Sequence, residues 1–137
     1  MAQGDSKSAN FKQPLLPQDL LDFVELTAFT RRWEQLGLDV ETDLLALQLA
    51  IMADPEAGRV VAGADGLRKT RFAPTRWNTG KSGAVRVLYV YFREIGVVLL
   101  CLVYGKNEID NISEAVKQRL AKTIGEIEQE LRKKKDA

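Results

Sequence analysis

The N-terminal half of the chain carries apolar residues at spacings that predict one strand followed by two helices. The apolar run Leu20–Leu26 predicts the strand. A short helix follows and ends before Gly37, because glycine readily adopts the backbone conformation that closes helices. Asp39 is placed to cap a second helix over about 41–53, where apolar residues recur at helical spacing.

The pattern changes in the central part of the chain, where β-branched and aromatic residues are concentrated. After a glycine-rich loop over 58–66, the segment Leu67–Phe72 predicts a strand. Two longer apolar runs, Ala84–Phe92 and Val97–Tyr104, predict strands that are joined by a tight turn. We therefore expect an antiparallel hairpin with a third strand preceding it.

The last part of the chain predicts an amphipathic helix that Ser113 caps and that ends near Arg132. Its apolar stripe consists of Val116, Leu120, Ile124, Ile127 and Leu131. The order of elements predicts an α+β fold with a small antiparallel sheet of about four strands. We expect the two N-terminal helices and the C-terminal helix to pack on one face of this sheet, which leaves the other face open for a functional site.

Composition indicates a single globular domain. The chain has 137 residues, of which 45% are hydrophobic and 28% charged. We expect the polar residues 1–18 to form a flexible arm and residues 19–137 to form the domain. No apolar run has the length of a membrane span, and the N-terminus lacks the apolar core of a secretory signal. The single cysteine, Cys101, lies in an apolar run, which fits a buried thiol in the reducing cytoplasm.

The absence of histidine narrows the possible chemistry. It excludes Ser-His-Asp and Cys-His nucleophile pairs, and it excludes histidine-ligated metal sites. Acid–base catalysis would need a carboxylate, a lysine, a tyrosine, an N-terminal amine or the substrate itself. We expect neither a metal nor a cofactor.

The charges are segregated along the chain, although the net charge is only +1. Residues 1–58 contain four basic and ten acidic residues, whereas residues 59–106 contain nine basic and two acidic residues. Aromatic residues are interleaved with the basic segment, as in proteins that bind phosphates through cations and bases through rings. Charge alone leaves a second interpretation open, in which the cations only keep a sheet edge soluble.

Strand alternation places Lys69 and Arg71 on one face of the first central strand and Arg68 on the other. If the three central strands are neighbours in sequence order, the first two residues lie close to Arg86 and Lys106. Like charges gather favourably only around an anion, so this convergence predicts a phosphate site. In the alternative interpretation each cation pairs separately with an acid from the set Asp65, Glu94, Glu108 and Asp110.

The loop before the hairpin contains Gly80–Gly83, which shares glycine, lysine and serine with phosphate-binding loops. A P-loop needs a further glycine at position 75 and a helix after it, but this chain has Thr75 and a predicted strand. We therefore reject a nucleotide-binding loop and consider two roles, a basic loop that touches the substrate backbone or a plain connection. Trp77 has two similar interpretations, because it can stack on a base or cover the sheet edge.

Five segments carry a resemblance to a known family when they are taken in this order: TAFTRRWEQLG, ADPEAG, GADGLRKTRFA, GKSGAVRVLYVYF and LLCLVYGKNEIDNIS. Together they resemble the RelE superfamily of bacterial toxins, and within it the HigB-like branch. The resemblance extends from about Val24 to Leu131. It implies the toxin of a toxin–antitoxin system, which cuts translated mRNA in the ribosomal A site.

The resemblance also implies a chemistry and a set of partners. A ribose 2′-OH attacks the adjacent phosphate without a metal, and the products are a 2′,3′-cyclic phosphate and a 5′-OH. The implied partners are a cognate antitoxin, mRNA and the ribosome with its 16S rRNA, in the cytoplasm and without a membrane.

Matching the motifs position by position assigns roles to basic residues of the central strands. Lys69 would activate the 2′-OH, either as a base or electrostatically, with Arg71 as the second member of the basic pair. Arg86 would hold the scissile phosphate and stabilise its developing charge. Lys106 would assist the leaving 5′-oxygen. The residues expected to bind RNA are Arg68, Arg76, Trp77, Lys81, Tyr104 and Asn107.

The chain departs from some members of the family in one respect. Those members have a tyrosine near the site at the C-terminus, but this chain has none after Tyr104. Two other functions therefore stay open on the same fold. One is a ParE-like toxin that targets gyrase, and the other is a non-catalytic module that binds nucleic acid or protein.

Overall fold

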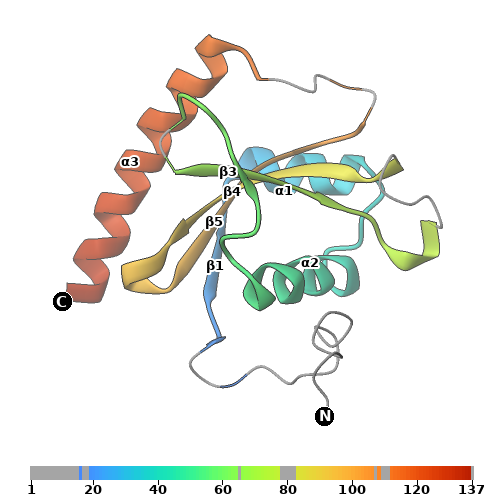
Figure 1. The fold of residues 1–137 in the computed structure, drawn as a ribbon, viewed down its shortest axis with the longest axis horizontal. Helices are drawn as coiled ribbons and strands as arrows, with labels where there is room; N and C mark the ends of the chain where they lie inside the picture. Colours follow the sequence, from blue (N-terminus) through green and yellow to red (C-terminus); the bar gives the residue numbers. More distant parts are fainter. Residues whose placement is uncertain are drawn as a thin grey trace.

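Within the described residues, the fold is a five-stranded sheet with helices on both of its faces (Figure 1). The computed structural model describes residues 16, 19–64, 66–77, 83–106, 108 and 112–136. The helices and strands are β1 (Asp22–Glu25), α1 (Thr27–Gln35), α2 (Thr42–Ala53), β2 (Arg59–Val60), β3 (Leu67–Phe72), β4 (Val85–Phe92), β5 (Val97–Tyr104) and α3 (Glu114–Asp136). Two one-turn 3-10 helices are η4 (Thr75–Trp77) and η6 (Arg93–Ile95).

The strands lie in the order β1-β5-β4-β3-β2. β1 runs parallel to β5, whereas all other neighbouring strands are antiparallel. The predicted hairpin of β4 and β5, with β3 beside it, is confirmed. The sheet is larger than the four strands expected, because β2 forms in the segment predicted as a loop. Two residues are too few to show an alternating pattern in a sequence.

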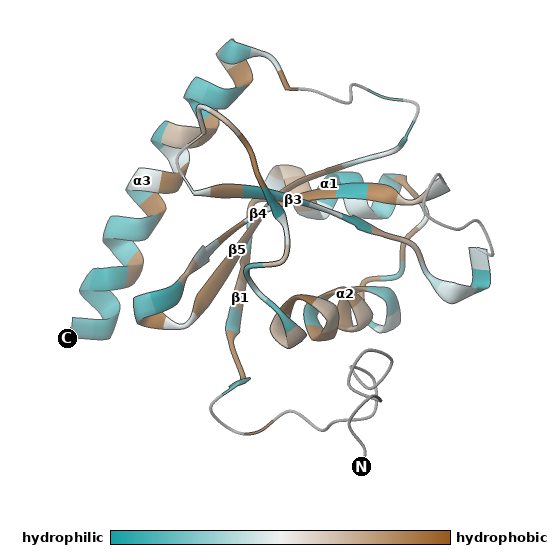
Figure 2. Ribbon diagram, in the orientation of Figure 1, coloured by the Kyte–Doolittle hydropathy of each residue, from teal (hydrophilic) through white to brown (hydrophobic). Residues whose placement is uncertain are grey.

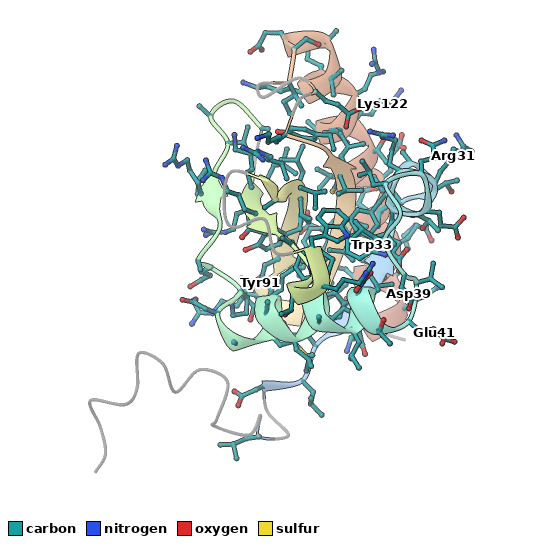
Figure 3. All side chains as sticks on the ribbon, turned by 90° about the vertical axis from the view of Figure 1, so that its right-hand side faces the viewer. Arg31, Trp33, Asp39, Glu41, Tyr91 and Lys122 are labelled. Carbon is teal, nitrogen blue, oxygen red and sulfur yellow. The ribbon has the colours of Figure 1, made fainter. Side chains whose placement is uncertain are left out.

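Helices α1 and α2 cover one face of the sheet. Phe29 and Trp33 of α1 and Leu47 of α2 are buried there against apolar side chains of β4 and β5. The N-cap of α2 is Glu41, which makes no capping hydrogen bond through its side chain, but the carboxylate of Asp39 accepts a hydrogen bond of 2.6 Å from the backbone N–H of Thr42, the first residue of the helix. The backbone carbonyl of the same aspartate accepts a hydrogen bond of 2.8 Å from the indole of Trp33. This contact fixes the end of α1 against the start of α2. Figure 3 labels both Trp33 and Asp39.

Helix α3 packs on the opposite face, so the expectation that all three helices share one face is wrong. The predicted stripe is the buried side of the helix, where Leu120 and Ile124 pack against β4 and β5. Figure 2 shows hydrophobic positions recurring between hydrophilic ones along α3. The physical reason lies in the strands, since β4 and β5 are apolar at nearly every position. Alternation then places apolar side chains on both faces, and both must be covered from water.

Helix α3 covers only one end of its face. Near its start, the ammonium of Lys117 donates a hydrogen bond of 2.9 Å to the carbonyl of Ala62, which precedes β3. Near its end, Arg132 forms an ion pair of 3.3 Å with Glu94 in the turn between β4 and β5. The start of β3 pairs with the end of β4. The segment before β3 and the turn after β4 therefore lie at the same end of the sheet, and both contacts of α3 are at this end. The opposite end of this face is left uncovered by α3.

Cys101 of β5 is fully buried, as predicted from its apolar surroundings. Burial alone raises the pKa of its thiol to about 12. The thiol is therefore protonated at neutral pH and serves as an apolar core group.

Two further expectations concern the ends of the chain and membranes. Of the arm predicted over residues 1–18, only Leu16 belongs to the described residues. Among the helices described, none combines the length and the apolar character that crossing a membrane requires.

Candidate functional site

Three polar side chains form a row across the end of the sheet that α3 does not reach. Arg71 of β3 pairs with Arg86 of β4, which in turn pairs with Tyr104 of β5. Directly paired residues of antiparallel strands project to the same face, with their Cβ atoms about 5 Å apart. Arg71 is exposed, whereas Arg86 is buried and donates a hydrogen bond of 2.5 Å to the carbonyl of Ala84.

A second row lies two residues further along the strands, toward α3. Arg59 of β2 pairs with Lys69 of β3, which pairs with Leu88 of β4. Two residues of a strand span about 7 Å. Lys69 and Arg71 therefore share a face, as strand alternation predicts, and that face also carries Arg86. We call Arg59, Lys69, Arg71 and Arg86 the cation cluster.

The two described acids that were candidate partners of these cations are engaged elsewhere. Glu94 pairs with a residue of α3, and Glu108 pairs with a residue of α1. The other two candidates, Asp65 and Asp110, lie outside the described residues. Four cations on adjoining positions of one sheet face present several hydrogen-bond donors side by side, which suits an anionic group.

Lys106 lies in the turn that follows β5, at the same end of the sheet as the first row. It is exposed and stands two residues after Tyr104. Glu108 holds this turn, because its carboxylate accepts a hydrogen bond from the backbone N–H of Gly105 and forms an ion pair with Arg32. These contacts lower the pKa of Glu108, with the backbone hydrogen bond as the largest cause. The turn that carries Lys106 is thus tied to α1.

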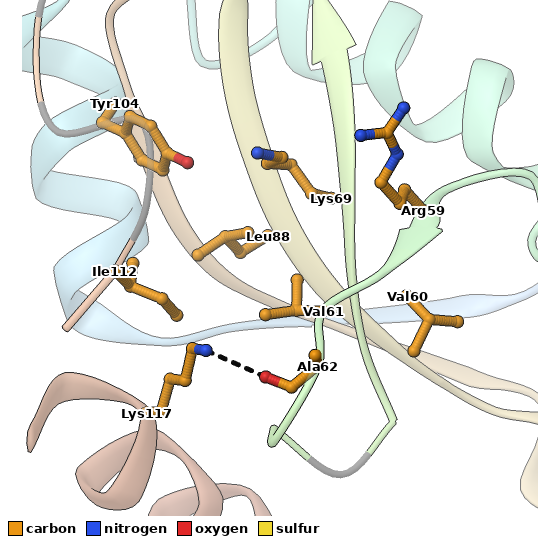
Figure 4. A pocket seen from close by; sticks show the side chains of 9 residues that line it. All are labelled: Arg59, Val60, Val61, Ala62, Lys69, Leu88, Tyr104, Ile112 and Lys117. Atoms are coloured by element: carbon orange, nitrogen blue, oxygen red, sulfur yellow. Dashed lines mark hydrogen bonds between the residues drawn. The ribbon is translucent and has the colours of Figure 1, made fainter. Parts of the chain in front are cut away.

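A pocket of about 250 Å³ opens beside the second row (Figure 4). Its walls come from β2 and the connection that follows it, from β3, β4 and β5, and from the start of α3. The residues that line it are Arg59, Val60, Val61, Ala62, Lys69, Leu88, Tyr104, Ile112 and Lys117. The pocket and the cation cluster therefore share Arg59 and Lys69, and they form one continuous site.

Three residues expected to bind RNA do not join this site. Arg68 projects to the opposite face and donates hydrogen bonds of 2.8 and 2.9 Å to two carbonyls of the connection between α2 and β2. Arg76 forms a two-pronged ion pair with Asp43 of α2, at 2.5 and 2.6 Å. This hydrogen bonding is the largest cause that lowers the pKa of the Asp43 carboxyl. Trp77 packs against the core under α1 and α2, which agrees with its interpretation as a cover for the sheet.

The remaining predicted RNA-binding residues have different outcomes. Tyr104 lines the pocket, while Lys81 and Asn107 lie outside the described residues. Two cations of the site, Arg59 and Lys117, are not among the residues predicted from the sequence. The one sequence signal for Arg59 is its place at the start of the basic segment. Lys117 reaches the site only because α3 packs where it does.

A metal site is not found in the part of the chain that the structure describes. No group of three or more cysteine, aspartate or glutamate side chains there is placed to hold a metal ion. The described site consists of cations, a tyrosine and apolar side chains, a donor set that suits an anion and an aromatic ring.

Two solved structures of the Escherichia coli toxin RelE are similar to this chain. A mutant of RelE with two arginines replaced by alanine, in the free state, superposes with a TM-score of 0.51 at 21% sequence identity. The match covers 72% of this chain and 97% of that chain. The chain has a RelE-like fold. The isolated RelE toxin is also similar, with a TM-score of 0.47, 24% identity, and coverage of 73% of this chain and 99% of that chain.

The RelE-like fold agrees with the fold class expected from the sequence motifs. No protein-family model matches the chain. The structural match therefore establishes the architecture, and the function has to be argued from the residues of the site.

Proposed function

We propose that the chain is a toxin of the RelE type that cleaves mRNA on the translating ribosome. The observation that carries this proposal is the cation cluster on one face of a RelE-like sheet. Four cations from three adjoining strands offer the donors that a phosphate backbone requires. The motifs between residues 24 and 131 add the HigB-like branch to the proposal. A cognate antitoxin and a cytoplasmic location belong to it as well.

The proposed reaction needs no group beyond the RNA and the side chains. The 2′-oxygen of a ribose loses its proton to the uncharged form of Lys69 and forms a bond to the adjacent phosphorus. The bond from phosphorus to the 5′-oxygen breaks, and Lys106 supplies the proton that the leaving oxygen takes up. The products are a 2′,3′-cyclic phosphate and a 5′-OH.

Arg86 and Arg71 have the electrostatic role in this proposal. They are directly paired across β3 and β4, so their guanidinium groups can hold two oxygens of one phosphate. Negative charge builds up on these oxygens as the new bond forms. Cations that are fixed in place before the reaction stabilise such charge strongly, because nothing has to reorganise around it. The buried, backbone-bonded position of Arg86 meets this condition.

The test is an in vitro translation reaction with a defined mRNA, followed by mapping of the new 5′ ends. We expect cuts in translated mRNA and none in the same mRNA without ribosomes. Arg86→Met should lower cleavage by at least about 100-fold, the typical effect of removing one preorganised donor. The control is Arg93→Met, which removes the same charge from an exposed turn at the far end of the sheet.

Two results would contradict the proposal. Full activity of Arg86→Met would contradict the assignment of the active site, provided that circular dichroism shows both variants folded. No cleavage by the folded wild-type chain would contradict the proposed nuclease activity itself. Inhibition of DNA supercoiling would then support the gyrase-directed alternative.

A further inference from the structure

The pocket beside the cation cluster differs from the cluster in its chemistry. Its inner surface includes the apolar side chains of Val61, Leu88 and Ile112. Arg59 and Lys117 stand at its rim, on opposite sides in Figure 4. Among the described residues, none of the nine that line it carries a carboxylate, and the acid Glu114 contacts one of them, Lys117. A phosphate alone would gain nothing from the apolar surface, and a purely apolar ligand would gain nothing from the cations.

A nucleobase combines the two properties that this pocket offers. Its faces are apolar and pack against aliphatic or aromatic side chains, and its edge carries hydrogen-bond acceptors that arginine and lysine recognise. The volume of about 250 Å³ lies below the roughly 300–1,000 Å³ of pockets for drug-sized ligands. It therefore fits one ring system and not an extended molecule.

The position of the pocket relates it to the phosphate that the cluster would hold. Leu88 lies two residues from Arg86 on the same face of β4, and Lys69 lies two residues from Arg71 on β3. The pocket thus begins about 7 Å along the strands from the arginine pair. Tyr104 belongs to both places, because it pairs with Arg86 and lines the pocket. A nucleotide next to the bound phosphate reaches the pocket without a turn of the backbone.

Lys117 keeps one donor for a ligand beside its two contacts within the protein. Its ammonium carries three protons, of which one is given to the carbonyl of Ala62 at 2.9 Å and a second faces the carboxylate of Glu114 at 3.5 Å. The bond to Ala62 holds the start of α3 against the segment that follows β2. The same lysine therefore shapes the pocket and faces into it.

We propose that this pocket binds the nucleobase of a nucleotide adjacent to the cleaved phosphate, with Arg59 and Lys117 contacting acceptors on the base edge. The inference rests on the proposed function and extends it to the selection of sequence. Donors on both sides of the pocket favour the keto bases guanine and uracil over the amino bases adenine and cytosine.

The test measures binding of short oligoribonucleotides whose reactive ribose has a 2′-H, so that the bound RNA stays intact. Each nucleotide that flanks the protected phosphate is replaced in turn by the four bases and by an abasic residue. We expect the abasic residue to weaken binding about tenfold at one flanking position only. At that position guanine and uracil should bind several-fold more tightly than adenine and cytosine.

Variants of the two rim cations connect this preference with the pocket. Arg59→Met and Lys117→Met should each reduce the difference between the bases to less than about twofold. The matched control is Lys122→Met, which makes the same substitution on the exposed side of α3 and should leave the preference unchanged. Circular dichroism checks the fold of each variant. Because the two variants are independent, the test can still be read if one of them fails to fold.

Equal binding of the abasic and intact oligonucleotides at both positions would contradict the proposal that the pocket binds a base, as would the absence of any binding. Base-independent binding together with intact cleavage on the ribosome would contradict only this proposal. Base-dependent binding without cleavage would support base binding and contradict the proposed nuclease activity. The two failures are therefore distinguishable.

Discussion

Arg76 and Asp43 show that a basic residue of the central segment can have a purely structural task. The carboxylate is buried on α2, and the half-exposed guanidinium in η4 satisfies both of its oxygens. The backbone N–H of Asp39 adds a third hydrogen bond of 2.7 Å. A buried carboxylate is costly without such partners, so the pair holds the connection after β3 against α2.

Removal of this guanidinium should destabilise the fold. We expect Arg76→Met to lower the free energy of unfolding by about 2 kcal/mol at pH 7, because Asp43 keeps its burial and loses its main partner. Urea denaturation measures the change. Arg93→Met, at an exposed position in η6, should change it by less than about 0.5 kcal/mol. Equal stability of the two variants would contradict the structural role.

The same pair predicts a dependence on pH. The pKa of Asp43 is lowered in the folded state, chiefly by the hydrogen bonds from Arg76. A lowered carboxyl pKa stabilises the fold above the pKa of the unfolded chain, which is about 3.9, and this contribution is lost as the pH falls through the folded-state value. The difference in stability between the wild type and Arg76→Met should therefore shrink below about pH 4. Urea titrations at pH 7, 5 and 3 test this expectation.

Residue-level prediction succeeds where alternation alone decides the outcome. Lys69 and Arg71 share a face because they are two residues apart in a strand, and this holds for any strand. The partner of Arg76 could not be predicted in that way, since Asp43 is 33 residues away and meets it only through the fold. Lys117 belongs to the same class, because the packing of α3 decides where its ammonium lies.

At the scale of elements, β4 and β5 explain both a success and an error. Their apolar composition marks them as strands, and their bounds agree closely with the prediction. The same composition also predicts that both faces of the sheet are covered. A strand with one exposed face alternates apolar with polar residues, and these two strands do not. Placing all helices on one face ignores this feature. The packing of α3 on the second face follows from it.

The packing of α3 should contribute strongly to stability. Ile124 is 6% exposed and lies in the cluster between α3 and the sheet. We expect Ile124→Ala to cost about 2–4 kcal/mol of unfolding free energy, the usual range for such a truncation in a core. Lys122→Ala, on the exposed side of the same helix, should change it by less than about 0.5 kcal/mol. Similar small effects of both changes would show that the helix is not packed on the sheet.

At the scale of the whole molecule, the segregation of charge along the chain becomes a segregation in space. The acidic first part forms α1 and α2 on one face, while four cations of the basic part lie together on the other. Such a distribution attracts a polyanion to one side of the molecule. If that polyanion is RNA, as proposed, its affinity should be sensitive to salt, because bound cations displace the counterions of the phosphates.

The salt dependence can be assigned to single residues. For single strands, the slope of log K against log salt concentration is about −0.7 for each phosphate contact. Arg71→Met should reduce the magnitude of this slope by about 0.7 for the uncleavable oligoribonucleotide. Arg93→Met should leave it unchanged, although it removes an equal charge. Equal reductions by both variants would mean that RNA responds to net charge and not to the cluster.

The alternation of β3 also governs how this molecule can change over time. Its residues at positions 67, 69 and 71 face α3 and the site, whereas positions 68, 70 and 72 face the core under α1 and α2. Substitutions at one set can therefore alter substrate handling while the other set keeps the scaffold intact. A deletion of one residue in this strand would exchange the two sets at once. Descendants of this chain should thus vary in β3 by substitution, while its length stays constant.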